Sequence, residues 1–69
     1  MASFTSTKGL VMRIVRERRR LGSAAVSVEE IANDMEGERS LEQARRACRA
    51  LVELGRLVDV GGEVYELAQ

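Results

Sequence analysis

Five of the ten arginines lie in the second half of the chain, most of them on a segment with helical periodicity. A guanidinium group is a flat, permanently charged fork of N–H donors that can bind two acceptor oxygens at once, as a phosphate or the edge of a guanine presents them. A glutamine amide offers the donor and acceptor pair that matches an adenine edge. The candidate binding residues of this segment are Arg39, Ser40, Gln43, Arg45, Arg46 and Arg49.

The sequence lacks a histidine base and a metal-binding set of side chains, and its carboxylates fall on solvated helical faces. It has no histidine and one cysteine, so neither a disulfide nor a tetrahedral zinc site can be built, and no glycine-rich loop is placed to hold a phosphate. Cys48 falls on the apolar side of its predicted helix, as a small core residue does. We therefore predict a protein that is not an enzyme, has no cofactor or metal, and takes no small-molecule substrate.

Three helices are predicted to carry these residues. The first begins at Thr5, Ser6 or Thr7, after a flexible tail over residues 1–5, and ends at Gly22. Its apolar stripe, by helical spacing, is Leu10, Val11, Ile14, Val15 and Leu21. The charged residues of this segment fall on the other side of the helix, except for one arginine, Arg18, which lies within the apolar arc.

The second and third helices each begin with a capping-box pattern. Ser27 with Glu30, and Ser40 with Gln43, have the spacing at which each side chain bonds the backbone N–H of the other residue. Gly37 is placed to end the second helix, which leaves the tight connection of a helix-turn-helix. The second helix is predicted to bury Ile31, Ala32 and Met35, and the third to bury Leu41, Ala44, Ala47, Cys48, Leu51, Val52 and Leu54.

A β-hairpin is predicted at the end of the sequence. Two β-prone runs, 57–60 and 63–67, flank Gly61-Gly62, the type of pair that two-residue turns with positive φ require. Pairing across that turn predicts one apolar face made of Val58, Val60, Tyr65 and Leu67. The short extended stretch at 24–26 can add a third strand.

The order of these elements resembles the winged helix-turn-helix superfamily from about Ser6 to Leu67. The most specific part is Leu51-Val-Glu-Leu-Gly-Arg-Leu-Val-Asp-Val-Gly-Gly-Glu-Val-Tyr-Glu-Leu, which looks like the end of a recognition helix followed by a wing, and Val28-Glu-Glu-Ile-Ala is similar to the helix before the turn. The resemblance implies an α+β fold in a single domain, 1–69, with the order helix, strand, helix, helix and two-stranded wing.

The resemblance also implies a function. In DNA-binding members the third helix enters the major groove, which would place Arg39, Ser40, Gln43, Arg45, Arg46 and Arg49 against double-stranded DNA. The expected function is a small sequence-specific DNA-binding protein, a transcriptional regulator in the cytoplasm. The wing departs from the pattern, because it carries Asp59, Glu63 and Glu66 where DNA-contacting wings commonly carry basic residues.

The charge distribution leaves a second function open. The net charge is zero, with basic segments at 1–20 and 39–56 alternating with acidic ones at 27–38 and 57–69. Glu42 and Glu53 can pair with the arginines of the third helix, and the acidic second helix can pair with the arginines of the first. The alternative is therefore a winged-helix module that associates with a protein within a larger assembly, without touching DNA. A homodimer that reads two half-sites belongs instead to the DNA-binding function. RNA is a weaker candidate because the sequence has one Tyr and one Phe for stacking, and no membrane span is expected.

Overall fold

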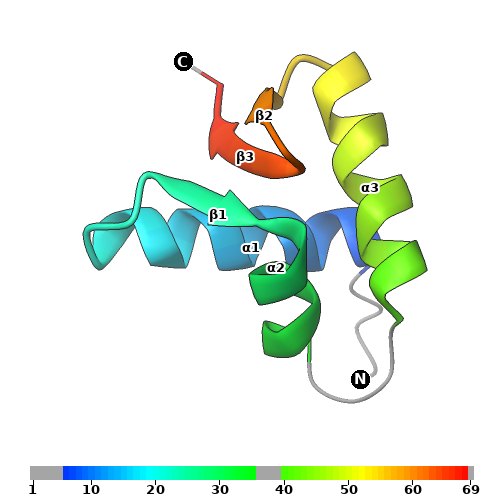
Figure 1. The fold of residues 1–69 in the computed structure, drawn as a ribbon, viewed down its shortest axis with the longest axis horizontal. Helices are drawn as coiled ribbons and strands as arrows, with labels where there is room; N and C mark the ends of the chain where they lie inside the picture. The colour runs from blue at the N-terminus through cyan, green and yellow to red at the C-terminus, as the bar shows by residue number, and fades with distance from the viewer. Residues whose placement is uncertain (1–5, 36–39, 69) are drawn as a thin grey trace, which may run out of the picture.

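The computed structural model describes residues 6–35 and 40–68, which form three helices and a small sheet. Their order confirms the predicted α+β winged-helix topology (Figure 1). The predicted tail over residues 1–5, Gly37 and Arg39 lie outside the described residues. The elements are α1 (Thr7–Arg20), β1 (Ala25–Ser27), α2 (Val28–Asp34), α3 (Leu41–Glu53), β2 (Leu57–Gly61) and β3 (Val64–Leu67).

The apolar sides of the helices and the inner face of the sheet share one core. Val11 and Val15 of α1, Ile31 of α2 and Cys48 of α3 have no exposed surface, and Tyr65 of β3 closes the core from the sheet side. The helix α2 has only seven residues, fewer than the roughly 12–15 that an isolated helix needs to be stable in water. Its place in the fold therefore depends on the burial of Ile31 and its neighbours.

Local signals set the helix ends as predicted. The hydroxyl of Ser6 accepts from the N–H of Gly9 at the start of α1, and both predicted capping boxes form at the starts of α2 and α3. At the end of α1, Gly22 has φ 104°, and the N–H of Ser23 donates to the carbonyl of Arg18. This reversal satisfies carbonyls of the last turn with a residue that tolerates the left-handed region.

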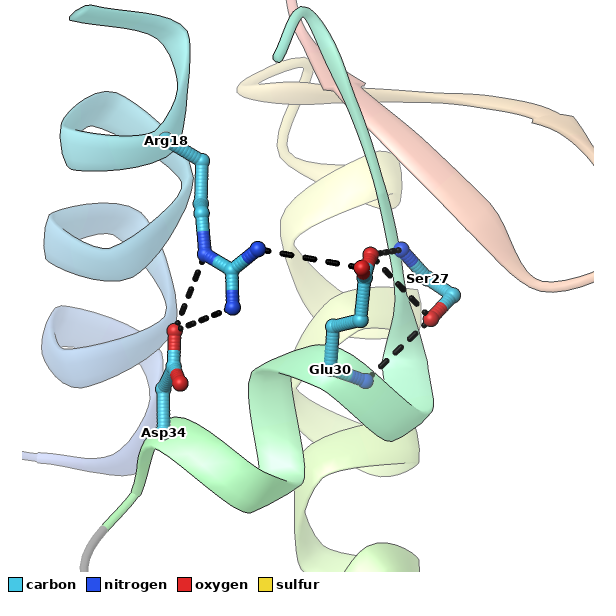
Figure 2. A network of polar contacts seen from close by, with 4 residues as sticks. All are labelled: Arg18, Ser27, Glu30 and Asp34. Carbon is cyan, nitrogen blue, oxygen red and sulfur yellow. Dashed lines mark hydrogen bonds and ion pairs between the residues drawn. The ribbon is translucent and has the colours of Figure 1, made fainter. Parts of the chain in front are cut away.

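One arginine of α1 joins that helix to α2 (Figure 2). Arg18 donates through Nε and Nη2 to a single carboxylate oxygen of Asp34, at 3.1 and 2.9 Å, and its Nη1 lies 3.7 Å from Glu30. Glu30 is also the capping-box partner of Ser27, so the same carboxylate starts α2 and faces α1. The predicted pairing between the first two helices is thus confirmed for Arg18.

The sheet has the strand order β1-β3-β2, with both pairings antiparallel. The predicted third strand forms, and Val26 of β1 lies opposite Tyr65 of β3. The carbonyl of Glu63, just before β3, accepts from the N–H of Val28 at 2.9 Å. The sheet therefore continues directly into the first residue of α2 and fixes the hairpin relative to the helices.

The predicted hairpin register is wrong by one residue. Val58 lies opposite Glu66 and Asp59 opposite Tyr65, with an irregularity between Asp59 and Gly61. The two turn residues are Gly62 and Glu63, with φ of 64° and 61°, rather than Gly61 and Gly62.

This shift moves two valines to the outside of the sheet. A change of one residue reverses the face of every side chain on the strand. Val58 and Val60 are consequently 46% and 48% exposed, whereas Tyr65 is buried as predicted and Leu67 is partly buried. The carboxylate of Asp59 accepts from the N–H of Gly61 at 2.8 Å and stabilises the irregular strand end.

Three leucines assigned to the core by periodicity are exposed: Leu21, Leu54 and Leu41, the first residue of α3. Leu21 and Leu54 follow the last residues of α1 and α3, each as the C-cap before a glycine with positive φ. The end of α1 extends beyond α2 (Figure 1), and Leu21 is 74% exposed. Periodicity predicts which side of a helix a residue occupies, but a neighbour must also reach that level for burial. Among residues 6–35 and 40–68, no helix has both the length and the apolar character needed to cross a bilayer.

Candidate nucleic-acid interface

The first turn of α3 is held by two of the predicted contact residues. The hydroxyl of Ser40 accepts from the N–H of Gln43 at 3.2 Å, and Oε1 of Gln43 accepts from the N–H of Ser40 at 2.9 Å. Both side chains therefore already satisfy donors at the helix start. Gln43 retains its NH₂ group as a donor toward a ligand.

Arg45 does not point freely into solvent. Its Nε donates to Oε2 of Glu63 at 2.6 Å and its Nη2 to Oε1 of the same residue at 3.4 Å, which makes a two-pronged ion pair with the wing turn. Its Nη1 donates to Glu42, one turn earlier on α3, at 3.3 Å. All three nitrogens of the guanidinium thus have carboxylate partners, and the side chain is only 31% exposed. The hydrogen bond from Arg45 lowers the pKa of the Glu63 carboxyl below its ordinary value.

Arg46 and Arg49 have a different environment on the same helix. Arg46 is 79% exposed, and its one ion pair with a described residue is to Glu42 at 3.8 Å. Arg49 is exposed, and none of the carboxylates in 6–35 and 40–68 lies within 4.0 Å of its guanidinium. The predicted pair between Arg49 and Glu53 is therefore absent. Arg39 lies outside the described residues.

An open groove runs between the start of α1 and the outer side of α3. It encloses about 460 Å³, and its lining residues are Ser6, Thr7, Lys8, Gln43, Arg46, Ala47 and Ala50. The small side chains of Ala47 and Ala50 let the two helices approach, while Lys8 and Arg46 supply positive charge. The groove therefore combines two cations with hydroxyl and amide groups.

Cys48 and Tyr65, which lie in the core under α3, are packing residues. Cys48 has no exposed surface, and burial raises the pKa of its thiol from 9.0 to about 11, with a further contribution from the nearby Glu63 carboxylate. Burial also raises the pKa of Tyr65. A thiol that ionises so reluctantly is a poor nucleophile at neutral pH, as expected for a core residue.

Two of the predicted contact residues, Gln43 and Arg46, lie on one groove. The side chain of Arg45 contacts the wing turn instead. Two participants were missed: Lys8, on the far side of the groove, and Glu63, the partner of Arg45. Glu63 had no detectable signal, because the sequence placed it in the second strand rather than in the turn, and its contact with Arg45 joins residues 18 positions apart. Lys8 had none, because its approach to α3 depends on how the helices cross.

The arginines of α1 divide in the same way. Arg18 is engaged with α2, and Arg20 lies 3.8 Å from Glu17 in its own helix. Arg13, Arg16 and Arg19 are exposed.

Comparison with known proteins gives no further assignment: no family model, no curated protein and no solved structure matches this chain.

Proposed function

We propose that this protein binds double-stranded DNA, with α3 in the major groove and the groove between α1 and α3 against a phosphate strand, and that it acts as a transcriptional regulator. The observation that carries the proposal is that Arg46, Lys8 and Gln43, two cations and an amide, lie on one groove beside the helix. Phosphate contacts of this kind position a protein on the duplex, and side chains that reach base edges supply specificity.

Arg46 and Arg49 are the strongest candidates for direct DNA contact. Both are exposed, and the one ion pair that Arg46 makes within the described residues, at 3.8 Å, is of the exposed kind that contributes at most about 1 kcal/mol. Such a pair exchanges readily for a phosphate or a guanine edge. The free thiol of Cys48 is compatible with a reducing cytoplasm, the location that belongs to this proposal.

The test is fluorescence anisotropy with a labelled duplex of mixed sequence, at about 50 and about 200 mM salt. We expect binding at the lower salt that weakens steeply at the higher salt. Arg46→Ala/Arg49→Ala should weaken binding at least about tenfold and flatten the salt dependence by about 2 in the log–log slope.

The matched control removes the same charge elsewhere. Arg19→Ala/Arg20→Ala deletes two exposed arginines at the other end of α1, about 18 Å along the helix from Lys8. It should weaken binding much less. Equal losses for the two pairs would mean that only bulk charge attracts DNA, and no binding by the folded protein at low salt would refute the proposal.

A second function, protein association without DNA contact, is favoured by one feature of the wing. Val58 and Val60 are half-exposed on β2, at the edge of the sheet, beside acidic side chains. An apolar patch with a polar rim is typical of an interaction surface. A wild-type protein that ignores DNA but self-associates, with association lost in Val58→Lys, would favour this function.

A further inference from the structure

The contact between Arg45 and Glu63 has the geometry of an arginine bound to an anion. Two nitrogens of the guanidinium face the two oxygens of one carboxylate, at 2.6 and 3.4 Å. A phosphate offers the same paired oxygens to the same fork. Within the described residues, Glu63 therefore occupies the place that a phosphate would take on Arg45.

We propose that Glu63 acts as an internal competitor for DNA: it holds Arg45 until a phosphate displaces it, and it thereby sets the affinity and the salt dependence of binding. This inference rests on the proposed function and goes beyond it, because it assigns to an acidic wing residue control over one arginine of the recognition helix. It also gives the acidic wing a role in a DNA-binding domain.

The backbone holds the competing carboxylate in place. Glu63 has φ 61°, in the left-handed region that side-chain-bearing residues rarely adopt. Its carbonyl accepts from the N–H of Val28, the first residue of α2. The hydrogen bond with Val28 and the contact with Arg45 therefore both hold the turn, and the glutamate occupies a position where glycine or asparagine would be favoured. The unusual φ and the hydrogen bond with Val28 fix the backbone of Glu63, and the two hydrogen bonds from Arg45 orient its carboxylate toward α3.

The contact can be exchanged without opening the core. The side chains of Arg45 and Glu63 are 31% and 46% exposed, so water and ions reach both. Glu42 brackets the same guanidinium from the other side at 3.3 Å, so two carboxylates surround one positive charge. The charge of Arg45 itself is therefore neutralised until its guanidinium is released from Glu63.

Arg45 also differs from its neighbours in a way that predicts what its release adds. Arg46 and Arg49 are exposed and require no exchange with the wing. Arg49 lies one helical turn after Arg45 on the same side of α3, and its charge also acts on Glu63. Releasing Arg45 would therefore lengthen an existing row of cations.

Two substitutions of Glu63 and one control test the proposal by anisotropy with the same duplex over a range of salt. Glu63→Gln keeps the size of the side chain but removes the charge. Glu63→Gly suits φ 61° and removes the side chain, which guards against misfolding. Glu66→Gln removes the same charge from the neighbouring strand, at a residue that pairs with none of the described cations. Circular dichroism verifies that each variant is folded.

If the proposal is right, both Glu63 variants bind about tenfold more tightly at low salt. In the wild-type complex Arg45 divides between Glu63 and phosphate, so the log–log salt slope of the variants is steeper by at most about 0.9, the effect of one full phosphate contact. Glu66→Gln should change the affinity less and leave the slope unchanged. Equal effects of Glu63→Gln and Glu66→Gln, or weaker binding by both Glu63 variants, would overturn the competitor role while leaving DNA binding intact. If no folded variant binds DNA, the proposed function itself fails.

Discussion

Two arginines of this protein, Arg18 and Arg45, have almost the same surroundings in chemical terms. Their side chains are 30% and 31% exposed, and each guanidinium lies between two carboxylates. The carboxylates around Arg18 both come from α2, where Glu30 also caps the helix. One carboxylate around Arg45 comes from its own helix, and the other comes from an exposed turn 18 residues away.

This difference shows that the same ion-pair chemistry can serve two purposes. The partners of Arg18 are placed by a helix that the core holds, so this cluster joins α1 to α2. The partner that matters for Arg45 belongs to the wing, on the surface proposed to meet DNA. Exposure alone would not distinguish the two arginines. The origin of the carboxylates does, and this distinction can be tested by experiment.

The largest expected effect comes from the core beneath the Arg18 cluster. Ile31→Ala should destabilise the fold by about 2–5 kcal/mol, because Ile31 is fully buried and its removal leaves a cavity. Arg18→Met, which keeps an apolar stem, should cost about 1 kcal/mol. Urea denaturation followed by circular dichroism measures both. If Arg18→Met costs as much as Ile31→Ala, the ion pairs rather than the core hold α2.

The second effect separates the two arginines by function. Arg18→Met should leave DNA affinity within about twofold of wild type once stability is matched. Arg45→Met should change wild-type affinity little, yet abolish the gain in the Glu63→Gln background. A double-mutant cycle on Arg45 and Glu63, read as DNA affinity at fixed salt, gives the coupling directly. Additive effects of the two substitutions would show that the wing contact does not control Arg45.

Much of this fold could be predicted from signals within short stretches of the sequence. The capping boxes at Ser27 and Ser40 and the stop at Gly22 were predictable, because caps depend on side chains within a few residues of the helix end. The element order was predictable for the same reason. Arg18 could be paired with α2 because a basic helix and an acidic one follow each other in the chain.

The hairpin register and the Arg45 contact could not be predicted in this way. Gly61-Gly62 is the better local match to a two-residue turn, yet the fold selects Gly62-Glu63, in which Glu63 contacts Arg45 and its carbonyl accepts from the N–H of Val28. Those contacts join residues distant in sequence. A pattern of neighbouring residues carries no information about such contacts. The predicted register was therefore wrong, and so was the predicted burial of Val58 and Val60.

A third, smaller effect uses Cys48 to report on the wing. Cys48 lies on the buried side of α3, one turn after Arg45, with a pKa of about 11. Its reaction with a disulfide reagent at pH 8 should be at least about a hundredfold slower than in the urea-unfolded chain. Glu63→Gln should accelerate the reaction, and Arg18→Met should not beyond its effect on global stability. Equal acceleration by both variants would show that Cys48 reports only global unfolding.

The same thiol predicts a loss of stability in alkali. The pKa of Cys48 is raised in the folded protein, so the contribution of the protonated thiol is complete below about pH 9, the ordinary value. It declines as the pH rises towards 11, because the unfolded chain releases the proton first. Urea midpoints between pH 8 and 11 should fall more steeply for wild type than for Cys48→Ala, after the loss common to both is subtracted.

The smallest effect is the acid titration of Glu63. Its pKa is lowered in the folded protein, chiefly by the hydrogen bond from Arg45, so its contribution to stability is present above the ordinary pKa of 4.5. That contribution disappears as the pH falls through the lowered value. The difference in unfolding free energy between wild type and Glu63→Gln should therefore be constant from pH 7 to about 5 and shrink in more acid solution. A difference that stays constant down to pH 2.5 would mean that the charge of Glu63 does not hold Arg45, and that the wing is held by its backbone bonds and its buried side chains, Leu57 and Tyr65 among them.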